Sequence, residues 1–309
     1  MDRRAQLRED QDWFAAARAD SSTLFIVARG TAHLVLRAPQ PAIAFVGHAH
    51  PAVATATPQN ALLLGWYQER RCVLIESAHA PDQDHVFAAP ENSGFEELRP
   101  LTQVLSEPEA SLLAYARALT YWRQRNRFCG VCGAENRAAR AGHVMHCSNR
   151  ACNQETFPRL DPAIIVLVTD GERALLGRQA SWPPNRYSTI AGFVEPGESL
   201  EDAVAREVLE ETGIRVASSS YHSSQPWPFP SSLMLGFQAE AASHEIHCND
   251  LELEEARWFT REDIASGHPR LPPATSISHR LIEHWYDSGG AAPLSSIANV
   301  GQWDTRAAR

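Results

Sequence analysis

The sequence predicts an α/β protein with more than one folded unit, and three observations support this. The chain has 309 residues, which is long for a single small domain. Short apolar runs alternate with segments of helical periodicity on both sides of a cluster of four cysteines. Hydrophobic residues make up 44% of the chain, enough to fill several packed cores.

Residues 1–125 are predicted to form a small N-terminal α/β domain. Five short apolar runs separated by turn-rich segments predict strands; these runs lie at 24–27, 34–36, 43–45, 62–66 and 72–75. A helix is expected at about 109–127, because Leu112, Tyr115 and Leu119 recur at helical spacing.

Two close pairs of cysteines mark the next unit, at residues 126–158. Two residues separate Cys129 from Cys132, four separate Cys147 from Cys152, and 14 lie between the pairs. This spacing is typical of a four-thiolate zinc ribbon. Disulfides are the alternative, although nothing in the sequence suggests secretion. Because four thiolates complete a tetrahedral site, the Zn²⁺ is expected to be structural rather than catalytic.

Residues 159–290 are predicted to form a second α/β domain. Strands are expected at 163–168, 173–178, 187–194, 233–239 and 256–259, and a closing helix at 275–286. The run at 163–168 is continuously apolar, which is typical of a strand buried on both faces. The last segment, 291–309, is rich in small and polar residues and is expected to be loose.

One helix of this domain carries its own start and stop signals. The segment at 192–214 reads GFVEPGESLEDAVAREVLEETGI. Ser199 and Asp202 have the spacing of a capping box, and Gly213 supplies a left-handed stop.

Three acidic side chains share one stripe of that helix. Glu207, Glu210 and Glu211 lie at i, i+3 and i+4, with no basic residue among them. A hard cation such as Mg²⁺ would relieve their repulsion, clamp a diphosphate and activate water. A solvated acidic face is the alternative interpretation.

The whole segment resembles the Nudix box, G-x5-E-x7-R-E-U-x-E-E-x-G-U with U aliphatic, and matches every fixed position. The resemblance implies hydrolysis of diphosphates linked to another moiety, with a divalent metal. It also implies a Nudix α/β/α sandwich with a mixed sheet, here preceded by a zinc ribbon and a smaller N-terminal α/β domain.

A second motif indicates a subfamily. The sequence SQPWPFP follows the box at 224–230, and the domain order is similar to that of the NADH pyrophosphatases. Three alternating prolines fix an extended backbone, so Trp227 and Phe229 would offer rigid surfaces on which a base could stack, at about 1–3 kcal/mol per base. A proline-rich loop whose aromatic rings fill the core is the alternative.

The resemblance implies a set of site residues. Mg²⁺ or Mn²⁺ would be held by Glu207, Glu211, Glu255 and the Ala191 carbonyl, with Glu252 and Glu254 close enough in sequence for the Glu255 assignment to shift. Glu210 or Glu255 would accept the water proton, and Arg206 would orient Glu207. The residues implied to contact substrate are Arg99, Phe157, Gln225, Pro226, Trp227, Pro228, Phe229, Pro230, Ser231, Ser232 and Ser278.

By this resemblance the chain is expected to cleave NAD(H) and related dinucleotides into nicotinamide mononucleotide and AMP. Removal of NAD caps from RNA, a wider range including ADP-ribose and diadenosine polyphosphates, and a binding module without catalysis are the alternatives. The net charge of −9 argues against a protein built mainly to grip a nucleic acid backbone. No run of about 18 apolar residues occurs, so no membrane span is expected. A cytoplasmic location follows as an expectation, and the resemblance implies a homodimer.

Overall fold

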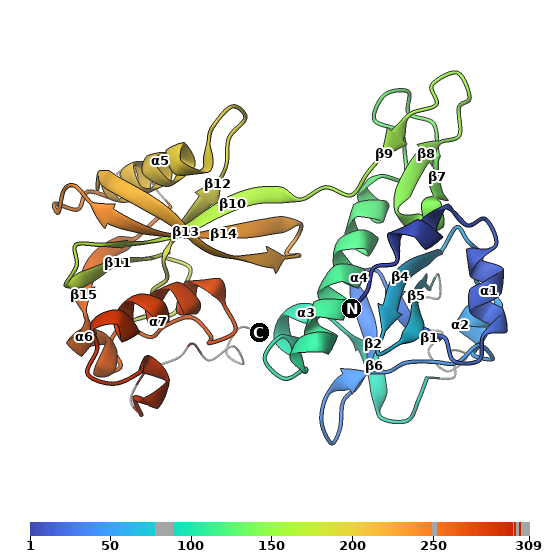
Figure 1. The fold of residues 1–309 in the computed structure, drawn as a ribbon, viewed down its shortest axis with the longest axis horizontal. Coiled ribbons are helices and arrows are strands. Elements are labelled where there is room, and N and C mark those ends of the chain that lie inside the picture. Colours follow the sequence, from blue (N-terminus) through green and yellow to red (C-terminus); the bar gives the residue numbers. More distant parts are fainter. Residues whose placement is uncertain (78–88, 249–251, 299, 301–302, 304–309) are drawn as a thin grey trace. The chain divides into compact units, whose positions relative to one another are not determined.

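A computed structural model describes residues 1–77, 89–248, 252–298, 300 and 303 (Figure 1). The chain divides into two compact units. The first comprises Met1–Arg159 together with Pro228–Ser231, and the second comprises Leu160–Trp227 with Ser232–Arg309.

A six-stranded mixed sheet is the centre of the first unit. Its order is β3-β2-β1-β5-β4, with β6 paired to β2 and with β1 parallel to β5. The strands are β1 (Leu24–Arg29), β2 (Ala32–Leu36), β3 (Ala42–Ile43), β4 (Ala61–Tyr67), β5 (Arg70–Glu76) and β6 (Ser93–Glu96).

Helices cover both faces of this sheet, because successive strand residues point to opposite sides. Ile26 packs in one core cluster with residues of α4 (Glu107–Arg125) and α3 (Leu98–Leu101). Phe25 packs in the other cluster with residues of α1 (Trp13–Ala19) and α2 (Pro51–Ala54).

The cysteine-rich segment folds as a separate three-stranded antiparallel sheet, β7-β8-β9. Its strands are β7 (Asn136–Ala139), β8 (Val144–Cys147) and β9 (Glu155–Thr156). Short 3₁₀ turns occur at Ala5–Glu9, Arg140–Gly142 and Leu294–Ser296.

The second unit is an α/β/α sandwich around a mixed sheet of order β13-β14-β10-β11-β15, with β12 paired to β10. Among the strand pairs that the structure describes in this unit, only β10 and β14 are parallel. The strands are β10 (Asp161–Thr169), β11 (Arg173–Arg178), β12 (Ile190–Phe193), β13 (Val216–Trp227), β14 (Ser232–Ala241) and β15 (Glu255–Thr260). The helices are α5 (Leu200–Thr212), α6 (Arg261–Ala265) and α7 (Ile277–Gly289). The predicted fold class is confirmed.

Strand β10 separates the two cores of this unit. Ile164 and Val166 pack toward α5, whereas Ile165 and Leu167 pack toward α7. The expectation of a strand buried on both faces is therefore confirmed.

Two parts of the second unit differ from the sequence expectation. Strand β13 runs over twelve residues, yet most are exposed or half-exposed, so no apolar alternation marks it in the sequence. The C-terminal segment was expected to be loose, but Leu294 is only 2% exposed and Ile297 packs against the core beside α7. Residues 299, 301–302 and 304–309 of that segment lie outside the described residues. Among the helices described, none is long and apolar enough to cross a membrane.

Candidate active site

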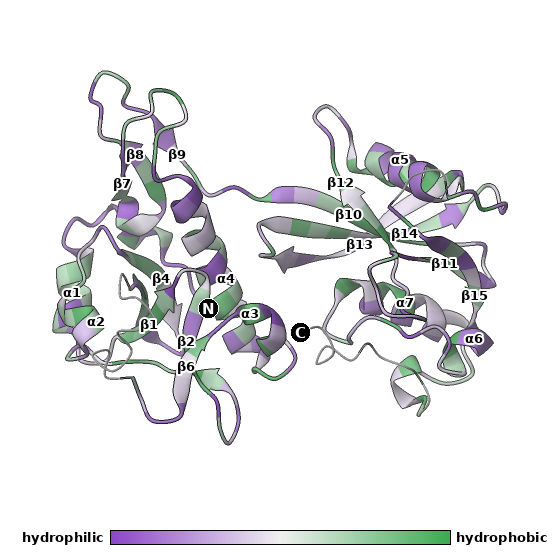
Figure 2. Cartoon of the chain, turned by 180° about the vertical axis from the view of Figure 1, so that it is seen from behind, coloured by the Kyte–Doolittle hydropathy of each residue, from purple (hydrophilic) through white to green (hydrophobic). Residues whose placement is uncertain are grey.

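Helix α5 begins and ends where the local sequence dictates. The Ser199 hydroxyl accepts from the Asp202 amide at 3.1 Å, and the Asp202 carboxylate accepts from the Ser199 amide, so the predicted capping box is confirmed. Gly213 ends the helix in the left-handed region, with φ of 71°. Figure 2 shows hydrophobic and hydrophilic residues alternating along α5, as expected of a helix packed on a sheet.

The acidic stripe of α5 is divided by burial. Glu207 is 9% exposed and Glu211 is 5% exposed, while Glu210 is exposed to solvent. Glu207 lies directly on β12, because a Cβ added at Gly192 would overlap its carboxylate. The glycine at this position therefore creates the space in which the Glu207 carboxylate rests, beside the Ala191 backbone.

Arg206 links several acceptors around this carboxylate. Its guanidinium lies 2.6 Å from Glu198 Oε1, 2.9 Å from Glu207 Oε1 and 3.1 Å from Glu210 Oε2. The same group donates to the Phe193 carbonyl at 2.8 Å. The hydrogen bonds from Arg206 lower the pKa of Glu198 to about 2. Arg206 therefore shares one charge among three carboxylates, and its predicted role of orienting Glu207 for catalysis stays a prediction.

Burial raises the pKa of Glu207, and Arg206 only partly offsets this. The charges of Glu210 and Glu252 raise the pKa of Glu207 further. Excess negative charge at a buried group is the condition that an added cation relieves, and carboxylate oxygens are the donors that Mg²⁺ and Mn²⁺ prefer. The chemistry of these residues fits a divalent metal. Within the described ranges, only the four cysteines bring three or more possible ligand atoms close together. The carboxylates expected to hold a divalent metal do not form a cluster that tight.

The fourth expected metal ligand, Glu255, faces elsewhere. Its carboxylate accepts from the hydroxyl of Tyr187, which belongs to the core beside α7. The next residue, Ala256, packs in the core beside α5. Since neighbours on a strand point to opposite faces, Glu255 points to the α7 side of the sheet.

Among the acidic residues just before β15, the charge of Glu252 contributes to the raised pKa of Glu207. The segment LELEE contains three acidic residues, and their spacing to the following aromatic residue was the only guide in the sequence to which of them belongs to the site. A metal role for Glu255 stays a prediction that its orientation disfavours.

The proline-rich motif spans the end of β13 and the turn before β14. Gln225, Pro226 and Trp227 are the last residues of β13, and Ser232 is the first of β14. Both ends of the Gln225 amide are occupied: its Nε2 donates to the Thr275 carbonyl at 2.8 Å, and its Oε1 accepts from the Ile277 amide at 2.9 Å.

The turn residues Pro228, Phe229, Pro230 and Ser231 belong to the first unit. The Phe229 ring packs against the core beside α4, with the guanidinium groups of Arg99 and Arg117 at 4.7 and 4.9 Å from its centroid. This arrangement favours the core-filling interpretation for Phe229, whose contact with substrate stays a prediction.

The remaining expected substrate residues have different settings. Phe157 is 54% exposed, so its ring is accessible. Ser278 is 4% exposed, and its hydroxyl binds Thr189 on the segment before β12. Thr189 has no role in the sequence-based site, because a lone threonine beside a strand carries no recognisable signal.

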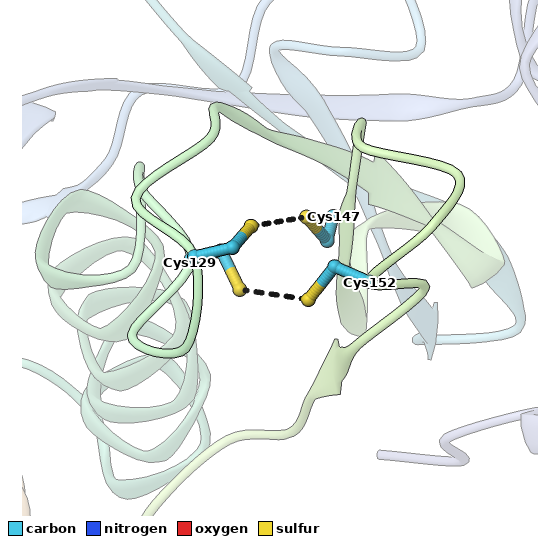
Figure 3. Close-up of side chains that lie close together, drawn as sticks. Cys129, Cys147 and Cys152 are labelled. Carbon is cyan, nitrogen blue, oxygen red and sulfur yellow. Dashed lines mark hydrogen bonds between the residues drawn. The ribbon is translucent and has the colours of Figure 1, made fainter.

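The four predicted zinc ligands converge. Figure 3 shows Cys129, Cys147 and Cys152 turned toward one another. The Sγ atoms of Cys129 and Cys152 are 3.8 Å apart, those of Cys132 and Cys147 are 3.4 Å apart, and all four lie within 4.8 Å of one another. A tetrahedral Zn²⁺ with bonds of about 2.3 Å requires sulfur separations of about 3.8 Å. The cluster fits one structural zinc ion, and all four cysteines are free thiols.

Family models match three consecutive parts of the chain. Residues 159–285 match the NUDIX domain, and residues 124–157 match the NADH pyrophosphatase zinc ribbon domain. Residues 22–122 match the NADH pyrophosphatase-like rudimentary NUDIX domain.

Two relatives are named NAD-capped RNA hydrolases. NUDT12 of Macaca fascicularis is 43% identical over 196 residues, which cover 59% of this chain and 42% of the relative. NudC of Stutzerimonas stutzeri (strain A1501) is 46% identical over 186 residues, which cover 60% of this chain and 65% of the relative. Among solved structures, a NUDIX hydrolase from Nitrosomonas europaea is 22% identical, with a TM-score of 0.44, and the match covers 53% of this chain and 92% of that one.

Proposed function

Because the chain belongs to the Nudix family, we propose that it is a metal-dependent hydrolase that cleaves the diphosphate of NAD(H) into nicotinamide mononucleotide and AMP. The observation that carries the proposal is the placement of Glu207 and Glu211. Both are buried on α5, and Glu207 rests on the Gly192 backbone. The zinc ribbon and the rudimentary domain, both of NADH pyrophosphatase type, support the choice of NAD(H).

Glu207, Glu211 and the Ala191 carbonyl would hold Mg²⁺ or Mn²⁺, together with Glu255 or its neighbour in sequence Glu252. The metal would neutralise phosphate charge and lower the pKa of an attacking water. Arg206 keeps the Glu207 carboxylate oriented through its bond to Oε1. Glu210, exposed beside Arg206, would receive the proton released by that water.

The substitution Glu207→Gln tests this assignment. The amide has the shape of the carboxylate but cannot supply a charged ligand, so we expect hydrolysis of NADH with Mn²⁺ to fall by at least about 100-fold. The fold should persist, because burial already disfavours the charged form of Glu207. Glu201→Gln, on the exposed first turn of α5, is the matched control. If Glu207→Gln released AMP at the parent rate, the metal assignment would be wrong.

NAD-capped RNA is the second candidate substrate, because both relatives described above are named for that activity. Hydrolysis of free NADH and of NAD-capped RNA should be compared at matched salt, since phosphate contacts depend strongly on ionic strength. RNA with a 5′-triphosphate is the control. ADP-ribose and diadenosine polyphosphates complete the comparison.

Two further features remain proposals. We propose a homodimer, for which the exposed Phe128 and Val131 on the ribbon would provide apolar contact surface. We also propose a cytoplasmic location, because four zinc-binding thiolates need a reducing compartment.

A further inference from the structure

The start of helix α7 is held by side chains from other parts of the second unit. The first amides of a helix lack partners within the helix and need them elsewhere. The Ile277 amide donates to Gln225 Oε1 at 2.9 Å, and the Thr275 carbonyl accepts from Gln225 Nε2 at 2.8 Å. One glutamine side chain thus binds a donor and an acceptor on either side of the helix start.

A second connection runs from α7 to the segment that leads into β12. Ser278 Oγ accepts from the Thr189 amide at 3.2 Å and from the Thr189 hydroxyl at 2.9 Å. The Ser188 hydroxyl lies 3.0 Å from the same oxygen. Ser278 and Thr189 are both buried, so water does not replace these bonds easily.

Gly236 in β14 allows the start of helix α7 to lie close to the sheet. A Cβ at Gly236 of β14 would lie 2.8 Å from Ile277 Cδ1 and 2.9 Å from the Ser223 carbonyl. Any larger residue at this position would push the start of α7 away from the strands. Glycine therefore permits both Gln225 and Ser278 to reach their partners.

The second connection ends close to the candidate metal site. Thr189 is two residues before Ala191 and three before Gly192, on which the Glu207 carboxylate rests. Ile190, between them, is 1% exposed and packs in the core beside α5. A displacement of Thr189 would therefore be transmitted along a short, packed strand to the backbone beneath Glu207.

We propose that Ser278 and Gln225 are positioning residues, through which the start of α7 aligns the backbone at 189–192 with the end of β13. This inference rests on the proposed function, since that function places a metal at Glu207 and the substrate near the end of β13. Neither side chain needs to touch substrate for this role. Ser278 sets the position of β12, on which the Glu207 carboxylate rests. Gln225 sets the position of the proline-rich motif at the end of β13.

Ser278→Ala and Thr189→Val each remove one side of the second connection. Both should lower kcat by about tenfold, because displacements well below 1 Å at a reacting centre reduce rates steeply. KM for NADH should change by less than about twofold, since the substrate contacts remain. Thr189→Ser keeps the hydroxyl and should restore kcat to near the parent value.

Matched controls separate alignment from general weakening of the helix. Ser276 caps α7 by accepting from the His279 amide, and Gln238 donates to the Leu281 carbonyl further along the helix. Ser276→Ala and Gln238→Leu should lower the melting temperature as much as Ser278→Ala and Gln225→Leu, with kcat unchanged. The double variant Ser278→Ala/Gln225→Leu should lose less than the product of the single losses, because both act through one element.

Amide hydrogen exchange tests the alignment without metal or substrate. Ser278→Ala should speed exchange in Ile190–Phe193 by about tenfold or more, whereas Ser276→Ala should affect only α7. Equal exchange in β12 for these two variants would overturn the inference. A parent protein that fails to hydrolyse NADH would instead overturn the proposed function, and exchange would still decide the role of Ser278.

Discussion

The two units differ in how an arginine compensates the charge of a neighbouring carboxylate. In the first unit, the buried Arg123 lies 3.0 Å from the carboxylate of the partly exposed Glu76 and donates to the Ala61 carbonyl at 3.2 Å. Burial raises the pKa of Glu76, and the full charge of Arg123 opposes that rise. In the second unit, Arg206 is divided among Glu198, Glu207 and Glu210.

The difference distinguishes a structural ion pair from the candidate functional site. Removing one member of a compensated buried pair is costly, and such a pair mainly maintains the fold. Burying a carboxylate that shares its counter-charge with other groups lowers the stability of the fold. Such carboxylates are typical of sites that bind ions or perform chemistry.

The helices that cover the two sheets differ accordingly. The buried face of α4 is formed mainly by Leu112, Leu113, Ala116 and Leu119. The buried face of α5 includes two glutamates among its alanine and valine residues. The first unit matches a domain described as a rudimentary NUDIX domain, and its covering helix lacks an acidic stripe of this kind.

The largest effect is expected from removing zinc, because the ribbon of the first unit would need its metal to fold, whereas the second unit would need a metal only for chemistry. Structural zinc contributes about 10–16 kcal/mol in zinc-finger peptides. Chelation, or Cys147→Ala, should abolish amide protection in Asn136–Cys147 and leave α5 protected. Cys248→Ala, at an exposed cysteine outside the cluster, is the control. Unchanged protection in the ribbon after loss of zinc would refute a structural role for the metal.

A smaller effect is expected when the space under Glu207 is filled. In Gly192→Ala the new methyl group would overlap the carboxylate, so Glu207 or β12 must move. We expect hydrolysis to fall by about 100-fold while the zinc content stays at one ion per chain. Gly47→Ala, where the added methyl group meets nothing within 4 Å, should have no effect. Full activity of Gly192→Ala would show that Glu207 need not rest on β12.

The smallest effect concerns a buried histidine of the first unit. Burial lowers the pKa of His143 to about 4, although its Nε2 binds the Leu63 carbonyl at 2.8 Å. The pKa of His143 in the folded state lies below the ordinary 6.5. The contribution of neutral His143 to the free energy of unfolding is therefore complete above pH 6.5 and is lost as the pH falls toward 4. The loss at pH 5 should be about 2 kcal/mol.

Urea unfolding at pH 7 and pH 5 measures this loss. His143→Gln retains a donor for the Leu63 carbonyl but does not titrate, so its stability should decline less between the two pH values. His48→Gln, at an exposed position, should decline as the parent does. Equal declines in the parent and His143→Gln would exclude His143 as the source.

Features encoded by short sequence spacing could be predicted. The capping box, the glycine stop and the four convergent cysteines all depend on residues close in the chain. Their geometry follows from helical periodicity and metal coordination, which need no knowledge of distant contacts.

Other features depended on which strands and helices meet. Glu255 and Glu252 are alike in sequence, and only the register of β15 in the sheet turns Glu255 toward Tyr187. Gln225 and Ser278 look like substrate contacts within a motif, yet their partners lie 50 to 52 and 89 to 90 residues away in the chain.

The sequence by itself determined the chemistry available to this protein: acidic side chains on one helix, four thiols at ribbon spacing, and two α/β domains. Only the tertiary structure decided that Glu207 and Glu211 are buried while Glu210 is exposed, and that Gly192 lies beneath Glu207. The physical reason is that burial and electrostatic compensation arise from packing between distant segments, whereas local spacing fixes only which side chains share a face.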